Sequence, residues 1–174
     1  IFDTNNIKRL KKNISKDKFT AADSQVASWW GNILDFRTFD LITPNEREAR
    51  FALKDQISHV KLLAAKIFDN SKCKNLILKL GQRGILVCLN NKHENSNNTF
   101  FLDSFAENVI DPVGSGDALL SYATMSMIVS KCKITSSIIG LLAAACECEK
   151  DGNIPITKED IMFKLDKIKS HLNI

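Results

Sequence analysis

The chain has 174 residues, of which 44% are hydrophobic and 25% charged, and this composition predicts one globular domain with a single core. Its formal net charge is +4, but lysines and acidic residues alternate and no basic face carries stacking aromatics, so nucleic acid is not an expected partner. No apolar run approaches the roughly 20 residues that span a bilayer, so we expect no membrane segment.

Helices and strands are predicted to alternate through the first part of the chain. Helices are inferred from apolar residues spaced three and four apart, and strands from short apolar runs that end at turn residues. In chain order, the patterns predict a helix at 4–16, a strand at 19–22, irregular structure from Trp29 and Trp30, a strand at 39–43, and helices at 45–54 and 58–68.

The rest of the chain predicts strands followed by helices. The expected elements are strands at 75–80 and 84–89, an asparagine-rich loop at 90–98, a strand at 99–102, helices at 115–130 and 134–148, a turn at 152–155, and a helix at 158–172. The whole pattern predicts a layered α/β domain with a mostly parallel sheet. Ligands of such sheets bind at the carboxyl ends of the strands, where the motifs of this chain fall.

The turn from Asp111 to Asp117 is the most informative motif. Gly114 and Gly116 allow a sharp turn that leads directly into a helix, whose first N–H groups have no partner within the helix. This arrangement predicts an anion site that suits phosphate. Asp117 is either a helix cap that complements the dipole or a base that accepts a proton from an attacking hydroxyl, and the residues alone leave both interpretations open.

This turn resembles the D-T-x-G-A-G-D signature of the ribokinase-like (PfkB) carbohydrate kinases. The matching positions are Asp111, Gly114, Gly116 and Asp117, while Pro112 and Ser115 replace the usual Thr and Ala. The resemblance implies a ribokinase-like α/β/α domain that transfers the γ-phosphoryl group of ATP to a hydroxyl of a small-molecule sugar or sugar phosphate. It implies that Asp117 is the base, that Gly114, Ser115 and Gly116 form the anion hole, and that Asp111 contacts the nucleotide.

A second family element, N-x-x-E, matches Asn45 and Glu48 at the start of the helix predicted at 45–54. The resemblance implies that Glu48 orients a magnesium-bound water network and the phosphates, with Asn45 beside it. Read without the signature, Glu48 is simply an acid in the first turn of a helix. The resemblance therefore implies ATP and Mg²⁺ as cofactors, and a monovalent cation stays open.

Three further segments resemble nucleotide-contacting parts of the same kinases. Gly81 and Gly84 match the T-x-G-x-x-G element, with Lys79 in the place of its threonine. Lys79 is either a phosphate contact or an exposed lysine at a strand end, and the glycines serve either the nucleotide or a hairpin turn. Ala144 lies in a small-residue helix and Gly152 in a turn where the family closes its adenine pocket; tight helix packing is the alternative.

A finer resemblance points to one subgroup of the family. Ala22-Asp23-Ser24-Gln25 and Gly152-Asn153-Ile154-Pro155 are similar to the kinase region of bifunctional ADP-heptose synthesis proteins, which implies a heptose phosphate as acceptor. The residues also leave open a non-catalytic module that binds nucleotide or phosphate, and a kinase for a nucleoside or a vitamin. Five cysteines without C-x-x-C spacing favour a reduced, cytoplasmic setting.

The resemblance covers only the carboxyl-terminal part of a kinase of roughly twice this length. We therefore expect residues 1–174 to be the nucleotide-binding part of a single kinase domain that lacks its amino-terminal half and lid. The first residue, Ile1, is not methionine, which also predicts a chain cut from something longer. Such a piece is expected to phosphorylate little alone and to need a homodimer or partner chain over its exposed edge.

Overall fold

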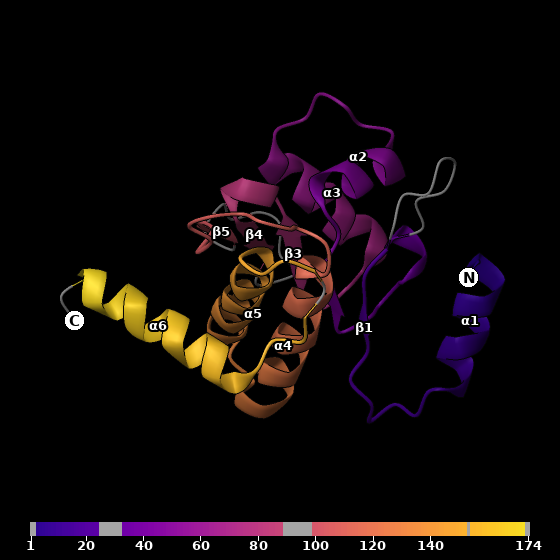
Figure 1. Cartoon of the computed structure of the whole chain (residues 1–174). Helices are drawn as coiled ribbons and strands as arrows, with labels where there is room; N and C mark the ends of the chain where they lie inside the picture. The colour runs from indigo at the N-terminus through magenta and orange to yellow at the C-terminus, as the bar shows by residue number, and fades with distance from the viewer. Residues whose placement is uncertain (1–2, 25–32, 89–98, 153, 173–174) are drawn as a thin grey trace. The chain divides into compact units, whose positions relative to one another are not determined.

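The structure of the chain, a computed structural model, describes residues 3–24, 33–88, 99–152 and 154–172 (Figure 1). The chain divides into two compact units. The first unit comprises Ile1–Leu80 and Leu86–Phe101, and the second comprises Gly81–Ile85 and Leu102–Ile174. Trp29, Trp30 and the loop predicted at 90–98 lie outside the described residues.

All the predicted helices and strands are present, and their bounds agree with the predictions within three residues. In chain order the elements are α1 (Thr4–Asn13), β1 (Ala21–Ala22), the 3₁₀ helix η1 (Ile33–Asp35), β2 (Leu41–Ile42), α2 (Glu46–Leu53), α3 (Val60–Ser71), β3 (Leu76–Lys79), the 3₁₀ helix η2 (Gly81–Arg83), β4 (Ile85–Cys88), β5 (Thr99–Leu102), α4 (Ser115–Ser130), α5 (Lys133–Cys148) and α6 (Lys158–Leu172).

The strands form a five-stranded sheet in the order β1-β2-β3-β4-β5. β1 and β2 are parallel, with Ala22 opposite Ile42, and β2 and β3 are parallel, with Ile42 opposite Leu76. A further parallel bridge between Asn45 and Lys79 carries this pairing past the end of β2. The three strands therefore end at one edge of the sheet, as the prediction of a mostly parallel sheet requires.

β1 and β2 are shorter than predicted because a side chain replaces part of their ladder. The carboxylate oxygen Oδ2 of Asp40 accepts hydrogen bonds from the backbone N–H and the hydroxyl of Thr20, both at 2.8 Å. The N–H of Leu41 then bonds the carbonyl of Thr20 at 3.0 Å. Only Ala21–Ala22 and Leu41–Ile42 remain as regular strand.

The core of the first unit joins alternate strand residues to one face of α3. Leu76 and Leu78 of β3 lie in the same buried cluster as Leu63, Ile67 and Phe68 of α3, so the strand period of two meets the helical spacing of three to four. Each such side chain, when fully buried, contributes about 1.5–3 kcal/mol of hydrophobic stabilisation. This cluster fixes the strand ends that carry the first group of predicted site residues.

The second unit is built on the close pairing of α4 and α5. A Cβ added at Gly140 would lie 2.9 Å from both the carbonyl oxygen of Leu119 and the Cβ of Ala123, so these helices approach too closely for a larger residue. α6 joins them through a small core that includes Leu142 and Ile161. Among the described residues, no helix is long and apolar enough to cross a membrane.

Candidate active site

The first group of predicted site residues, Asn45, Glu48 and Lys79, lies at the carboxyl edge of the sheet in the first unit, beside Asp23 and Thr43, which were not predicted as site residues. Asp23 directly follows β1, Thr43 directly follows β2, and Lys79 is the last residue of β3. The backbone N–H of Lys79 donates to the carbonyl of Pro44 at 2.8 Å, which holds the start of α2 against this edge. The register of the strands thus brings together residues that the sequence separates widely.

Asn45 and Glu48 form a reciprocal capping box at the start of α2. Oδ1 of Asn45 accepts from the N–H of Glu48 at 2.8 Å, and Oε2 of Glu48 accepts from the N–H of Asn45 at 2.7 Å. Glu48 is buried, with an exposed fraction of 4%. Burial raises the pKa of Glu48; the hydrogen bond from Asn45 opposes this rise, Asp23 adds to it, and Lys79 also opposes it. Glu48 therefore caps the start of α2, in agreement with its interpretation as an acid in the first turn of a helix.

The donor set at this edge suits Mg²⁺. Mg²⁺ binds one or two carboxylates and completes its octahedral shell with water and phosphate oxygens. Oε1 of Glu48 lies outside the capping box, whereas Oδ1 of Asn45 is used within it. Among the described residues, no group of three or more His, Cys, Asp or Glu side chains could hold a metal by itself. The edge is therefore suited to a metal ion that is also coordinated by phosphate oxygens and water. Its described side chains do not supply enough ligands to enclose a metal ion by themselves.

An ion pair between Asp23 and Lys79 is a part of this edge that the sequence motifs did not predict. The ammonium of Lys79 bonds Oδ2 of Asp23, and both side chains are largely buried, with exposed fractions of 16% and 19%. Between them in sheet order lies Thr43, whose buried hydroxyl has no hydrogen-bond partner in the described structure. The only sequence signal was the acid directly after the first predicted strand.

The second group of predicted site residues lies at the start of α4 in the second unit. Gly114 is the N-cap, in the left-handed conformation with φ 86°, and offers no side-chain cap. Oδ1 of Asp111 accepts from the N–H of Val113 at 2.9 Å, and the hydroxyl of Ser115 donates to the carbonyl of Pro112 at 2.7 Å. These local bonds shape the turn that the signature predicts.

The first turn of α4 leaves donors open. The N–H of Ser115 bonds the carbonyl of Pro112 at 3.3 Å, and that of Ala118 bonds Gly114 at 2.9 Å. Within the described part of the chain, the N–H groups of Gly116 and Asp117 have no such partner. The carboxylate of Asp117 is exposed and makes no hydrogen bond or ion pair to a described residue. Asp117 is therefore not a cap, and its carboxylate is available to a ligand.

The remaining predicted nucleotide contacts differ in their surroundings. A Cβ added at Gly84 would lie 2.0 Å from the carbonyl oxygen of Leu102, so this glycine is required by the chain's own backbone. Gly81 and Gly152 have φ of 62° and 78° with open space where a Cβ would lie. Ala144 is half-buried on α5. Gly84 thus serves a tight turn, while Gly81 and Gly152 leave room beside the backbone.

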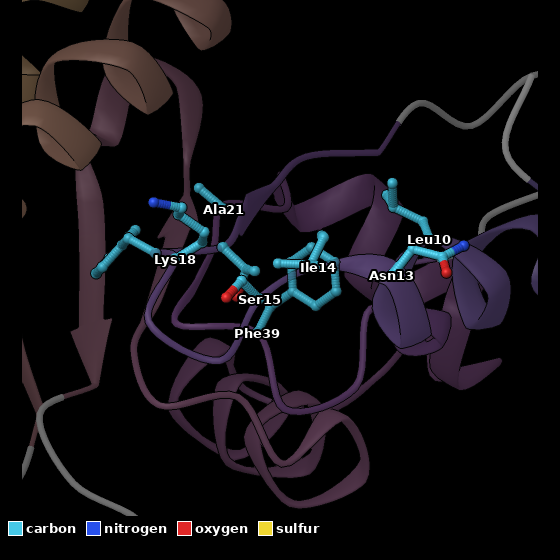
Figure 2. Close-up of a pocket in the computed structure, with 9 residues that line it drawn as sticks. Leu10, Asn13, Ile14, Ser15, Lys18, Ala21 and Phe39 are labelled. Atoms are coloured by element: carbon cyan, nitrogen blue, oxygen red, sulfur yellow. The ribbon is translucent and has the colours of Figure 1, made fainter.

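A separate hollow of about 530 Å³ lies in the first unit, between α1 and the segments that lead into β1 and β2 (Figure 2). Its lining includes Leu10, Ile14, Lys18 and Phe39 but none of the predicted site residues. It adjoins the amino ends of these strands, whereas ligands of open α/β sheets bind at the carboxyl ends. We therefore do not assign this hollow to the candidate site.

Comparisons with known proteins identify the family. The sequence profile of the pfkB family carbohydrate kinases matches residues 6–159, and the chain belongs to this family. A search of curated proteins finds no match.

Solved structures with the same fold come from several organisms. Ribokinase from Thermotoga maritima is 24% identical with a TM-score of 0.75, and 92% of this chain covers 52% of it. Phosphofructokinase-2 from Escherichia coli in complex with potassium is 19% identical with a TM-score of 0.75, and 98% of this chain covers 52% of it. Aminoimidazole riboside kinase from Salmonella enterica, complexed with aminoimidazole riboside and an ATP analogue, is 15% identical with a TM-score of 0.72, and 93% of this chain covers 56% of it. The fold is ribokinase-like, and the chain spans about half the length of these proteins.

Proposed function

We propose that the protein transfers the γ-phosphoryl group of ATP to a hydroxyl group of a small sugar or sugar phosphate. The observation that carries this proposal is the start of α4, where two N–H groups and one carboxylate have no partner among the described residues. Membership of a carbohydrate kinase family supports ATP as the phosphoryl donor. The finer resemblance favours a heptose phosphate as the acceptor.

Asp117 is proposed as the general base. Its carboxylate accepts the proton of the attacking hydroxyl, whose oxygen bonds the γ-phosphorus as the bond from that phosphorus to the β-γ bridging oxygen breaks; ADP leaves with those electrons. The N–H groups of Gly116 and Asp117 donate to phosphoryl oxygens, on which negative charge is spread in the transition state. Gly114 and Ser115 shape this turn, and Asp111 holds it through the N–H of Val113.

The carboxyl edge of the sheet is proposed to contact the nucleotide phosphates. Glu48, with Asn45 fixing its position, would hold Mg²⁺, which neutralises phosphate charge when bound. Lys79 would donate to a phosphate oxygen, and Gly81, Ala144 and Gly152 would lie along the nucleotide. A monovalent cation is a further candidate ligand of the complete enzyme.

The test uses the complete gene product with ATP, Mg²⁺ and a panel of sugars, sugar phosphates, nucleosides and vitamins. We expect turnover with one sugar class, lost in Asp117→Asn while ATP binding remains. Glu159→Gln is the matched control, because Glu159 is also an exposed acid in the first turn of a helix, α6. Full turnover in Asp117→Asn would refute the base, and ATP binding without turnover on any acceptor would favour a regulatory binding module.

A further inference from the structure

Asp23, Thr43 and Lys79 project from one face of the sheet. Successive side chains of a strand alternate between the two faces. The residues immediately before these three all belong to the core cluster that packs against α3: Ala22, Ile42 and Leu78. Asp23, Thr43 and Lys79 therefore lie together on the opposite face, at the carboxyl ends of three adjacent strands.

The ion pair between Asp23 and Lys79 crosses the middle strand. β2 lies between β1 and β3, and neighbouring strands are about 4.8 Å apart, so the two backbones are separated by roughly twice that spacing. The pair consequently crosses β2 at its carboxyl end, where Lys79 lies opposite Asn45. Thr43, two residues before Asn45, is fully buried, and its hydroxyl oxygen has no partner in the described structure. This unpartnered hydroxyl marks a polar position that the protein's own side chains leave unsatisfied.

Glu48 belongs to the same electrostatic group. Its pKa, which burial raises most, is raised further by Asp23 and lowered by Lys79, so the three charges are near enough to interact. The group contains two carboxylates and one ammonium. The net negative charge of this group repels a phosphate that approaches it and attracts a divalent cation. The ammonium of Lys79 makes that net charge smaller, so it weakens both effects.

We propose that the Asp23–Lys79 pair is a built-in counter-charge of the nucleotide site, which sets the balance between phosphate and divalent cation there. Lys79 donates to a phosphate oxygen of the bound nucleoside triphosphate, and Asp23 is a positioning residue that holds the ammonium across the end of β2. The inference rests on the proposed function for the location of the nucleotide. It goes further by predicting that the two members of the pair act in opposite directions on the two ligands.

The opposite signs follow from the charges. Removing Lys79 leaves two carboxylates, which bind a divalent cation more tightly but repel phosphate that carries no metal. Removing the charge of Asp23 leaves one carboxylate and one ammonium, so the net negative charge of the group is lost. Metal-free phosphate then binds more tightly and the divalent cation binds more weakly. A purely structural ion pair predicts no such pattern, because its loss disturbs both ligands in the same direction.

The experiment measures two equilibria on the complete gene product without any acceptor. One is the binding of Mn²⁺ alone, followed by its electron paramagnetic resonance signal, and the other is the binding of ATP in excess EDTA, followed by calorimetry. For Lys79→Met we expect ATP to bind about tenfold more weakly and Mn²⁺ severalfold more tightly. For Asp23→Asn we expect the reverse, with ATP bound more tightly and Mn²⁺ more weakly. For Lys79→Arg, which keeps the positive charge, we expect both affinities to stay close to those of the unsubstituted protein.

Lys74→Met is the matched control. Lys74 also pairs with an aspartate, Asp40, at 2.6 Å, but this pair precedes β3 and therefore lies at the amino end of the strand. We expect it to change neither equilibrium. Thermal unfolding of each variant reports whether the fold is retained.

Several outcomes would overturn the inference. They are a Lys79→Met variant that weakens both ligands, one that changes neither, and an unsubstituted protein that binds neither Mn²⁺ nor ATP. If the opposite-sign pattern holds but no acceptor is phosphorylated, the proposed kinase function fails while the charge-balance inference stands.

Discussion

Helices α2 and α4 begin with similar sequence patterns but use their first turns differently. Each follows a turn that contains a proline and carries an acid at its third helical position, Glu48 in α2 and Asp117 in α4. In α2 the acid is buried and closes a capping box with Asn45. In α4 the N-cap is a left-handed glycine, Gly114, and the acid is exposed.

The difference shows two ways of satisfying the free N–H groups of a helix start. α2 satisfies the N–H of Glu48 in its first turn, and that of its N-cap Asn45, with its own side chains, so this capping box contributes to stability without a ligand. α4 leaves the N–H groups of Gly116 and Asp117 to water or to a ligand, so its first turn is suited to binding. An acid at the third helical position therefore stabilises the helix start in α2, whereas in α4 it is exposed and open to a ligand.

The largest expected effect comes from the open helix start. Asp117→Asn should lower turnover by about 10²–10⁴-fold, the usual contribution of a positioned base, because the amide cannot accept the proton. Its free energy of unfolding should change by less than about 0.5 kcal/mol, since the side chain is exposed. Steady-state kinetics and urea unfolding measure the two quantities. A large loss of stability would place Asp117 in the same structural role as Glu48.

The closed helix start should show the reverse pattern in stability. Glu48→Ala should lower the free energy of unfolding by about 2 kcal/mol, because it removes the capping box and leaves the N–H of Asn45 without its acceptor. Urea unfolding in EDTA isolates this loss from any bound cation. Glu159→Ala, which changes an exposed acid in the first turn of α6, is the control and should have little effect. Equal losses in the two variants would contradict the box as the cause.

A smaller loss of stability is expected when Gly114, the N-cap residue of α4, is substituted. Gly114→Ala should cost about 1 kcal/mol of unfolding free energy, because alanine is strained at φ 86°. Gly152→Ala gives the reference cost of a left-handed residue, since its φ is 78° and a Cβ there would meet nothing within 4 Å. Chemical unfolding of both variants compares the two costs. Unchanged stability of Gly114→Ala would argue against the left-handed cap.

The smallest effect concerns the charge of Glu48. Burial raises its pKa, so the native state holds the proton more tightly than the unfolded chain does. The stabilising contribution of this proton is fully present below the unfolded pKa of about 4.5 and is lost as pH rises through the folded pKa. Glu48→Gln keeps an oxygen for the box and carries no charge, so its stability relative to the unsubstituted protein should increase with pH.

Unfolding curves measured in EDTA from pH 4 to pH 7 test this expectation. The Glu48→Gln variant should match the unsubstituted protein at the acidic end and exceed it at the neutral end. Asp117→Asn is the comparison at the open helix start, where the carboxylate is exposed. A stability difference for Glu48→Gln that decreases with rising pH would show that the buried carboxylate is stabilised as an anion.

Local sequence was sufficient for the elements of the fold and for the helix starts. The helix predicted at 115–130 is Ser115–Ser130, and Asn45 and Glu48 sit three residues apart, as a capping box requires. Apolar periodicity and capping involve residues only a few positions apart, so the chain specifies them without long-range contacts. The same locality allowed the signature turn to be recognised as a helix start with free N–H groups.

Only the tertiary structure decided which candidate site residues contact other parts of the chain. Asp23 and Lys79 are 56 positions apart, and only the strand order and register bring them together across the end of β2. Likewise, the close approach of Gly84 to the carbonyl of Leu102, which leaves no room for a Cβ, is visible only in the folded chain. Such pairings depend on the folding of distant segments into one sheet or one turn, because neither partner carries a local signal of the other.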